Sequence, residues 1–160
     1  MNKAELLQRI VQTLEHDVEV LRRAAQTAYE TATAEENIAE NKYDTLGLEA
    51  SYLATGQARR AAEIRQALLA YQQLRVRDYD PARGIQVSNL VTLEDPHGRQ
   101  RLLFLGPEAA GLKIGEGDRQ VTVITPRSPL GQQLLGKVQD DDVSLVLAGV
   151  MQVQVVVAVV

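Results

Sequence analysis

The sequence predicts an α+β protein, in which a long antiparallel helical hairpin is followed by a small domain of antiparallel strands with one short helix. In the first half, apolar or small residues recur at alternating steps of four and three, and after residue 84 the period changes to two. Between these patterns, residues 78–84 mix Pro, Gly and Asp, which is typical of a domain boundary. We therefore expect a coiled-coil hairpin over residues 1–77, a linker over 78–84 and a C-terminal domain over 85–160.

The first helix is expected to begin after Asn2 and to continue to about Ala34. Asn2 is a good N-cap, and Glu5 three residues later forms a variant of the capping box. The second helix has two alternative starts, near Ala39 or after Asp44 and Thr45, and should end near residue 76. The two predicted seams are Leu7, Val11, Leu14, Val18, Leu21, Ala25, Ala28 and Ala32, and then Ala50, Ala54, Gln57, Ala61, Ile64, Leu68 and Tyr71.

The seams fix how the two helices pair. In an antiparallel pair the residue numbers of partners add to a constant, and a sum of about 75 matches bulky residues at the base and Ala near the turn. Leu14 is then opposite Ala61, and the chain reverses between Asn37 and Ile38. The acidic residues 35–44 therefore form the tip.

The second half reads as about five short antiparallel strands. We expect strands over residues 85–94, 101–105, 121–125, 143–147 and 151–159, separated by turns that contain Gly, Pro or Asp. A two-turn helix stands between the third and fourth strands. Ser128 is its N-cap, Pro129 its first residue, Leu134 and Leu135 its apolar face, and Gly136 its C-terminal stop.

Composition narrows the functional class. The chain has no Cys, which excludes a disulfide, a thiol nucleophile and Cys-ligated metal, and it has no apolar run long enough to span a membrane. The net charge of −4 argues against a protein that neutralises many phosphates by itself. We expect a cytoplasmic protein, and a partner that already holds nucleic acid rather than free DNA.

The helix segment carries a resemblance to a known family. Ser128-Pro129-Leu130-Gly131 followed by Leu134-Leu135-Gly136-Lys137, after an N-terminal helical hairpin, resembles the bacterial Gre transcript cleavage factors over nearly the whole chain. The resemblance implies an FKBP-like C-terminal domain that docks on RNA polymerase at the rim of its secondary channel. It implies a partner-binding segment made of Ser128, Pro129, Leu130, Gly131, Leu134, Gly136 and Lys137.

The same resemblance implies a role for the hairpin tip. In the family the tip enters the channel, and its acids help to hold a Mg²⁺ ion shared with the polymerase, whose own active site cuts the backtracked RNA. The protein would then be no enzyme itself, would reach the nascent RNA 3′ end only indirectly, and would have no membrane or small-molecule partner.

The tip departs from the family pattern. Glu40-Asn41 matches its Glu-Asn, but its Asp falls on Asn37, its Gly falls on Glu36, and Tyr43 stands one position early. Because Mg²⁺ prefers charged oxygen ligands, Glu36 or Glu35 would have to replace the missing charge. The candidate catalytic residues are Glu40, Asn37 and Glu36, with Glu40 as the candidate metal ligand, and the tip neighbours are Glu35, Asn41, Tyr43 and Asp44.

Alternatives to cleavage stimulation stay open at this point. The tip can enter the channel without stimulating cleavage, as an antagonist, or it can be a solvated turn with neither role. A helical-hairpin interaction or scaffold protein is a further class. An independent hydrolase is disfavoured, because an exposed tip cannot wall off a pocket.

Overall fold

The structure is a computed structural model that describes residues 2–34 and 46–160, with the side chains of Ala32 and residues 46–52 outside the description. The predicted turn between the helices falls in the residues that are not described. The chain divides into two compact units. One contains residues up to Ile10 together with Ala70–Val160, and the other is Val11–Leu69.

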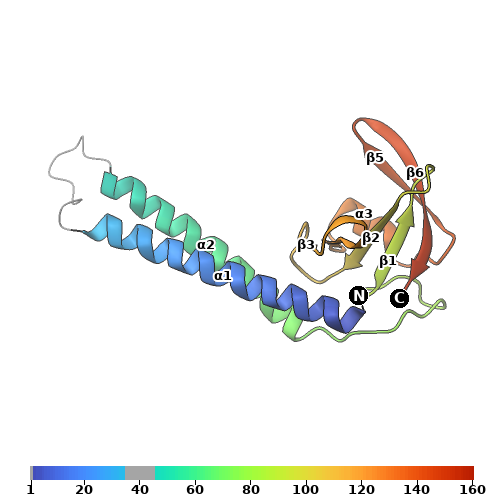
Figure 1. The fold of residues 1–160 in the computed structure, drawn as a ribbon, viewed down its shortest axis with the longest axis horizontal. Coiled ribbons are helices and arrows are strands. Elements are labelled where there is room, and N and C mark those ends of the chain that lie inside the picture. The colour runs from blue at the N-terminus through green and yellow to red at the C-terminus, as the bar shows by residue number, and fades with distance from the viewer. Residues whose placement is uncertain (1, 35–45) are drawn as a thin grey trace. The chain divides into compact units, whose positions relative to one another are not determined.

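The second unit is an antiparallel pair of helices. Helix α1 spans Lys3–Thr33 and α2 spans Leu46–Gln72, and Figure 1 shows them running side by side in opposite directions. Among the described side chains of this unit, the buried ones are Leu14, Ala28, Ala54, Ala61 and Ala67. The predicted partners Leu14 and Ala61 are thus both buried, 4% and 2% exposed. The N-cap is also as predicted, since the Glu5 N–H donates to Asn2 Oδ1 over 2.8 Å.

Helix α2 ends earlier than residue 76. Tyr71, in its last turn, donates its hydroxyl proton to the Glu108 carbonyl over 2.8 Å. Further along, the Arg77 N–H donates to Ser88 Oγ over 2.8 Å, and Lys3 Nζ donates to the Arg77 carbonyl. These tertiary bonds use the backbone groups of Arg77, and the Leu74 N–H donates to the Tyr71 carbonyl, a tighter bond than that of an α-helix.

The first turns of α1 bury different residues from those predicted. Leu6 and Ile10 are fully buried, whereas the seam positions Leu7 and Val11 are only partly buried. Leu6 and Ile10 belong to the same compact unit as the sheet, and Leu6 lines a cavity of about 310 Å³ with Leu90, Leu102, Arg119 and Val121. The sheet is therefore the partner of this end of α1.

The first unit contains a six-stranded sheet with the strand order β3-β4-β2-β1-β6-β5. The remaining elements are β1 Leu90–Glu94, β2 Gln100–Leu105, β3 Lys113–Ile114, the 3₁₀ helix η2 Gly117–Arg119, β4 Val121–Ile124, α3 Pro129–Leu134, β5 Asp142–Leu147 and β6 Val150–Val159.

The structure corrects two predictions about the sheet: that all its strands are antiparallel, and that the first strand starts at residue 85. Strands β2 and β4 are parallel, with Leu103 beside Thr122. The parallel pair requires a long connection, which residues 106–120 supply, and this connection contains the extra strand β3. Strand β1 begins only at Leu90, because the Ile85 N–H donates to the Lys137 carbonyl and residues 86–89 form a turn. In this turn the Asn89 N–H donates to the Gln86 carbonyl and Ser88 has φ 83°.

The sheet has a core on each face. On one face lies a hydrophobic cluster drawn from five strands, the segment before β1 and α3: Ile85, Val91, Leu93, Leu103, Leu105, Ile124, Leu134, Val143 and Val156. The opposite face carries Leu102, Phe104 and Val121, which alternate with that cluster along the strands. This second face meets Leu6, so the sheet is covered on both sides within one compact unit.

Candidate partner-binding surface

Helix α3 has the cap that the sequence predicts. Ser128 has extended backbone angles, and its hydroxyl accepts the Gly131 N–H over 3.0 Å while donating to the Thr125 carbonyl over 2.8 Å. Pro129 occupies the first turn, where its missing N–H costs nothing. At the other end, Gly136 has φ +79°, a left-handed angle that suits Gly. The start and the end of α3 are therefore fixed by local chemistry.

Two residues of the candidate segment support the structure rather than the surface. Gly131 is buried, and a Cβ atom there would lie 1.9 Å from the Thr125 carbonyl oxygen, so only Gly fits. Leu134 is fully buried in the core cluster. Both residues hold α3 against the sheet, and neither is placed to touch a partner.

The end of the segment is joined to the chain before β1. The Gly136 N–H donates to the Ile85 carbonyl over 2.9 Å, and the Ile85 N–H donates to the Lys137 carbonyl over 2.8 Å. A Cβ on Gly84 would lie 2.3 Å from the Gly136 carbonyl oxygen, which shows how closely the two backbones approach. Residues 128–137 are therefore held at both ends.

Few residues of the segment 128–137 are exposed to solvent. Pro129, Leu135 and Gly136 are exposed, Lys137 is partly exposed, and Leu130 packs against the core cluster. The prediction that Leu135 faces inward with Leu134 is wrong, since Leu135 is 42% exposed. Helix α3 ends at Leu134, and Leu135 is its C-cap with non-helical backbone angles, so Leu135 does not continue the buried face. Binding by this segment stays a prediction, and its outward residues are the ones able to make contact.

Gln133, which is not among the predicted site residues, connects α3 to the sheet edge. Its side-chain Nε2 donates to the Ser144 carbonyl over 2.8 Å, and its Oε1 accepts the Ser144 N–H over 3.1 Å. The carboxamide thus bonds to β5 as a neighbouring strand would. No sequence signal distinguishes it from an ordinary polar residue of a short helix.

Glu108 connects the base of α2 with the residue before the Ser128 cap. Its carboxylate accepts Arg127 Nη2 over 2.7 Å, and its carbonyl accepts the Tyr71 hydroxyl. The hydrogen bond to Glu108 raises the pKa of Arg127. Burial, and secondarily the Glu108 charge, raises the pKa of the Tyr71 hydroxyl, which therefore stays neutral and donates. The exposed ion pair adds little stability, so Tyr71 is the main anchor.

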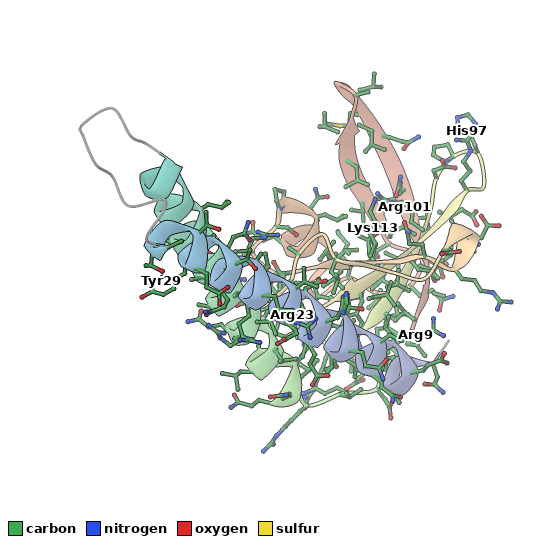
Figure 2. The ribbon with its side chains drawn as sticks, turned by 60° about the vertical axis from the view of Figure 1, so that its left-hand side comes forward. Arg9, Arg23, Tyr29, His97, Arg101 and Lys113 are labelled. Atoms are coloured by element: carbon green, nitrogen blue, oxygen red, sulfur yellow. The ribbon has the colours of Figure 1, made fainter. Side chains whose placement is uncertain are left out.

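The helix pair carries exposed groups of its own. Glu19 pairs with Arg22 over 3.0 Å and with Arg23 over 2.9 Å, and these hydrogen bonds lower the pKa of Glu19 to about 2. Tyr29 is 59% exposed and points outward near the end of α1 (Figure 2). These features fit a solvated flank.

The candidate tip residues lie outside the described part of the chain. They are Glu35, Glu36, Asn37, Glu40, Asn41, Tyr43 and Asp44. Within residues 2–34 and 46–160, no group of three His, Cys, Asp or Glu side chains is placed to hold a metal ion. The Mg²⁺ role of Glu40 thus stays a prediction. Across the same residues, no helix combines the length and the apolar character needed to cross a membrane.

The chain matches no protein-family model and no curated protein, but it resembles solved structures of transcription factors. Gfh1 of Thermus aquaticus is 25% identical, with 95% of this chain and 92% of that chain covered and a TM-score of 0.40. GreA factor homolog 1 of Thermus thermophilus is 24% identical, with 96% and 93% covered and a TM-score of 0.37.

A third similar structure is the elongation factor GreA/GreB of Nitrosomonas europaea. It is 16% identical, with 60% of this chain and 78% of that chain covered and a TM-score of 0.38. All three structures carry the names of Gre factors or of their homologues.

Proposed function

We propose that the chain is a regulator of transcription elongation that binds RNA polymerase, inserts its helical hairpin into the secondary channel and assists Mg²⁺-dependent cleavage of backtracked RNA. The observation that carries the proposal is the Gre-like motif of residues 128–137, held as a capped, rigid surface segment in a chain that also has a long helical hairpin. The motif resemblance supplies the partner. The hairpin supplies the means of reaching an active site that is distant from the docking surface.

The dimensions of the hairpin support this division of labour. Helix α1 has 31 residues and is therefore about 46 Å long at ~1.5 Å per residue. The acidic residues 35–44 follow its last residue, Thr33, in the chain. An element of that length can carry acids from a surface site into a deep channel.

The acids are proposed to act on the polymerase's active site rather than as an independent enzyme. Glu40 supplies one carboxylate, Asn37 a neutral carbonyl, and Glu36 a second carboxylate near them in the chain. Mg²⁺, when bound between tip and polymerase, stabilises negative charge on the reacting oxygens and favours charged ligands. The chain's contribution is then to bring Glu40 to an ion that the partner already holds.

The test is RNA cleavage in a stalled, backtracked elongation complex at saturating factor over a range of Mg²⁺ concentrations. We expect Glu40→Ala to abolish stimulation, because it removes the one acid that matches the family pattern. We expect Asn37→Asp to reach half-maximal rate at a lower Mg²⁺ concentration than the wild type. Polymerase affinity should change little in both variants, because docking is assigned to the C-terminal domain.

Asn37 also favours a second candidate function, because it lacks the charge that the family pattern has at this position. In that case the hairpin occupies the channel as an antagonist. If Glu40→Ala stimulated RNA cleavage at the wild-type rate, Glu40 would not be a residue that assists the metal. Absence of cleavage by Asn37→Asp, while it remains bound in the channel, would favour the antagonist.

A further inference from the structure

Strands β5 and β6 form a ribbon that extends past the rest of the sheet. They pair from Asp142 beside Val155 to Leu147 beside Val150. Strand β1 pairs only with residues 155–159 of β6, so residues 150–154 have β5 as their sole neighbour. Figure 1 shows this two-stranded projection beyond the other strands. At the base of the ribbon Val143 and Gln154 are buried, whereas the residues next to its turn are exposed.

The end of the ribbon is apolar on both faces. Cross-strand partners point to the same face, so Val146 and Met151 share one face with Val153, while Leu147 and Val150 share the other. The five residues, here called the ribbon tip, are all exposed: Val146 68%, Leu147 44%, Val150 67%, Met151 70% and Val153 46%. A ribbon that stayed in water would carry polar side chains on at least one face. An apolar patch of this kind marks a contact surface.

The ribbon tip is held in one shape. Its turn has two central residues, Ala148 at φ 51° and Gly149 at φ 77°, the signature of a tight type I′ turn. At its base, the Gln133 carboxamide bonds to both backbone groups of Ser144. The ribbon is thereby joined to α3, so that the candidate segment 128–137 and the ribbon tip belong to one compact unit.

The charges next to the ribbon in the sequence indicate which kind of partner surface fits the ribbon tip. No charged side chain occurs from Val143 to Val160, and the nearest charges in the sequence are Asp140, Asp141 and Asp142. A second copy of the chain would bring the same acids toward these, whereas a partner surface with Lys or Arg around an apolar groove would be complementary. The occupant favoured by these observations is therefore an apolar groove with a basic rim.

We propose that the ribbon tip is a second docking surface, which inserts into an apolar, basic-rimmed groove on the protein partner. This inference rests on the proposed function, in which that partner is RNA polymerase. The C-terminal domain then docks through two surfaces of one compact unit, the outward side of residues 128–137 and the ribbon tip. Neither the hairpin nor its acids take part in this contact.

The experiment measures binding of the fluorescently labelled full-length protein to core RNA polymerase by anisotropy. The test variant is the double substitution Val146→Thr and Val150→Thr, which keeps a β-branched shape and makes both faces of the tip polar. The matched control is Val160→Thr, the same change at a residue 59% exposed outside the ribbon. Met151→Thr is a second test variant. Circular dichroism and thermal unfolding of each variant establish that the fold is retained.

We expect the double variant to raise Kd about tenfold or more, and Val160→Thr to leave it within about twofold. Wild-type affinity in both the double variant and Met151→Thr would overturn the ribbon-tip inference and leave the proposed function standing. A wild-type protein that does not bind core polymerase would overturn both. Sedimentation equilibrium tests the alternative occupant, a second copy of the chain. A dimeric wild type together with a monomeric double variant would assign the tip to self-association and overturn the inference.

Discussion

At the residue scale, Gly131 is the position of the docking segment with the least room for a side chain. Because a Cβ would lie 1.9 Å from the Thr125 oxygen, Gly131→Ala should destabilise the C-terminal domain by about 2 kcal/mol or more. Gly56, inside α2 with nothing within 4 Å of its Cβ position, is the contrasting site. Gly56→Ala should stabilise its helix by about 0.5–1 kcal/mol. Urea unfolding followed by circular dichroism measures both, and a neutral Gly131→Ala would show that the contact with Thr125 relaxes.

Tyr71 gives the molecule an alkaline sensitivity. Its pKa is raised in the folded chain, first by burial and then by Glu108, so its contribution to stability is complete below the unfolded value of about 10 and is lost as pH rises above it. Tyr71→Phe should lose about 1 kcal/mol at pH 7 through the missing bond to the Glu108 carbonyl. It should also lose less stability than the wild type between pH 9 and pH 11, values chosen to bracket about 10. Equal slopes in that range would show that Tyr71 ionises as readily folded as unfolded.

Residues that act through local chemistry are the ones that the sequence predicts. Ser128 and Gly136 are recognisable because a cap and a left-handed stop need those residue types within a few positions. Gln133 and Glu108 are not recognisable, because their partners Ser144 and Tyr71 are brought near them only by the folded sheet.

At the scale of the element, the β5–β6 turn contains one residue poorly suited to its backbone. Ala148 adopts φ 51° although a residue with a Cβ is disfavoured there, and Asn tolerates that region better. Ala148→Asn should therefore raise the free energy of unfolding by about 0.5–1 kcal/mol. Gly149→Ala should lower it, although nothing lies within 4 Å of its Cβ position, because φ is 77°. Thermal unfolding measures both, and the same sign for the two changes would contradict the turn assignment.

The elements themselves are predicted unevenly. Helices α1 and α2 follow from a long periodic pattern, and α3 from its cap. The parallel β2–β4 pair and the late start of β1 do not follow, because both depend on which distant segment takes up the backbone hydrogen bonds. The acids at residues 35–44 lie outside the described residues, so that part of the candidate site stays a prediction.

At the scale of the whole molecule, α1 belongs to both compact units, which changes what its first residues do. Leu6 is fully buried beside Leu90 and Leu102 of the sheet, whereas Leu7, a predicted seam residue, is only partly buried. Leu6→Ala should therefore lower the free energy of unfolding by about 2–5 kcal/mol, and Leu7→Ala should lower it clearly less.

Hydrogen exchange tests whether the sheet, as well as α1, depends on Leu6. Leu6→Ala should increase amide exchange in β4, for example at Val123, as well as in α1. Faster exchange restricted to α1 would show that the sheet does not depend on Leu6.

A fragment of residues 84–160 lacks the buried side chains Leu6, Ile10 and Tyr71. It should therefore unfold at a lower urea concentration than the complete chain.

The burial of Leu6 against the sheet also sets the order in which the protein can be completed during synthesis. Leu6 is synthesised before Val121, which lines the same cavity, and more than a hundred residues separate the two in the chain. At roughly 5–20 residues per second, about 6–23 s separate the two. The first turns of α1 must wait through that interval with an apolar face exposed, and β1 receives its second neighbour only when β6, near the end of the sequence, is made. Chaperone contact during translation is therefore expected at the N-terminal end of α1.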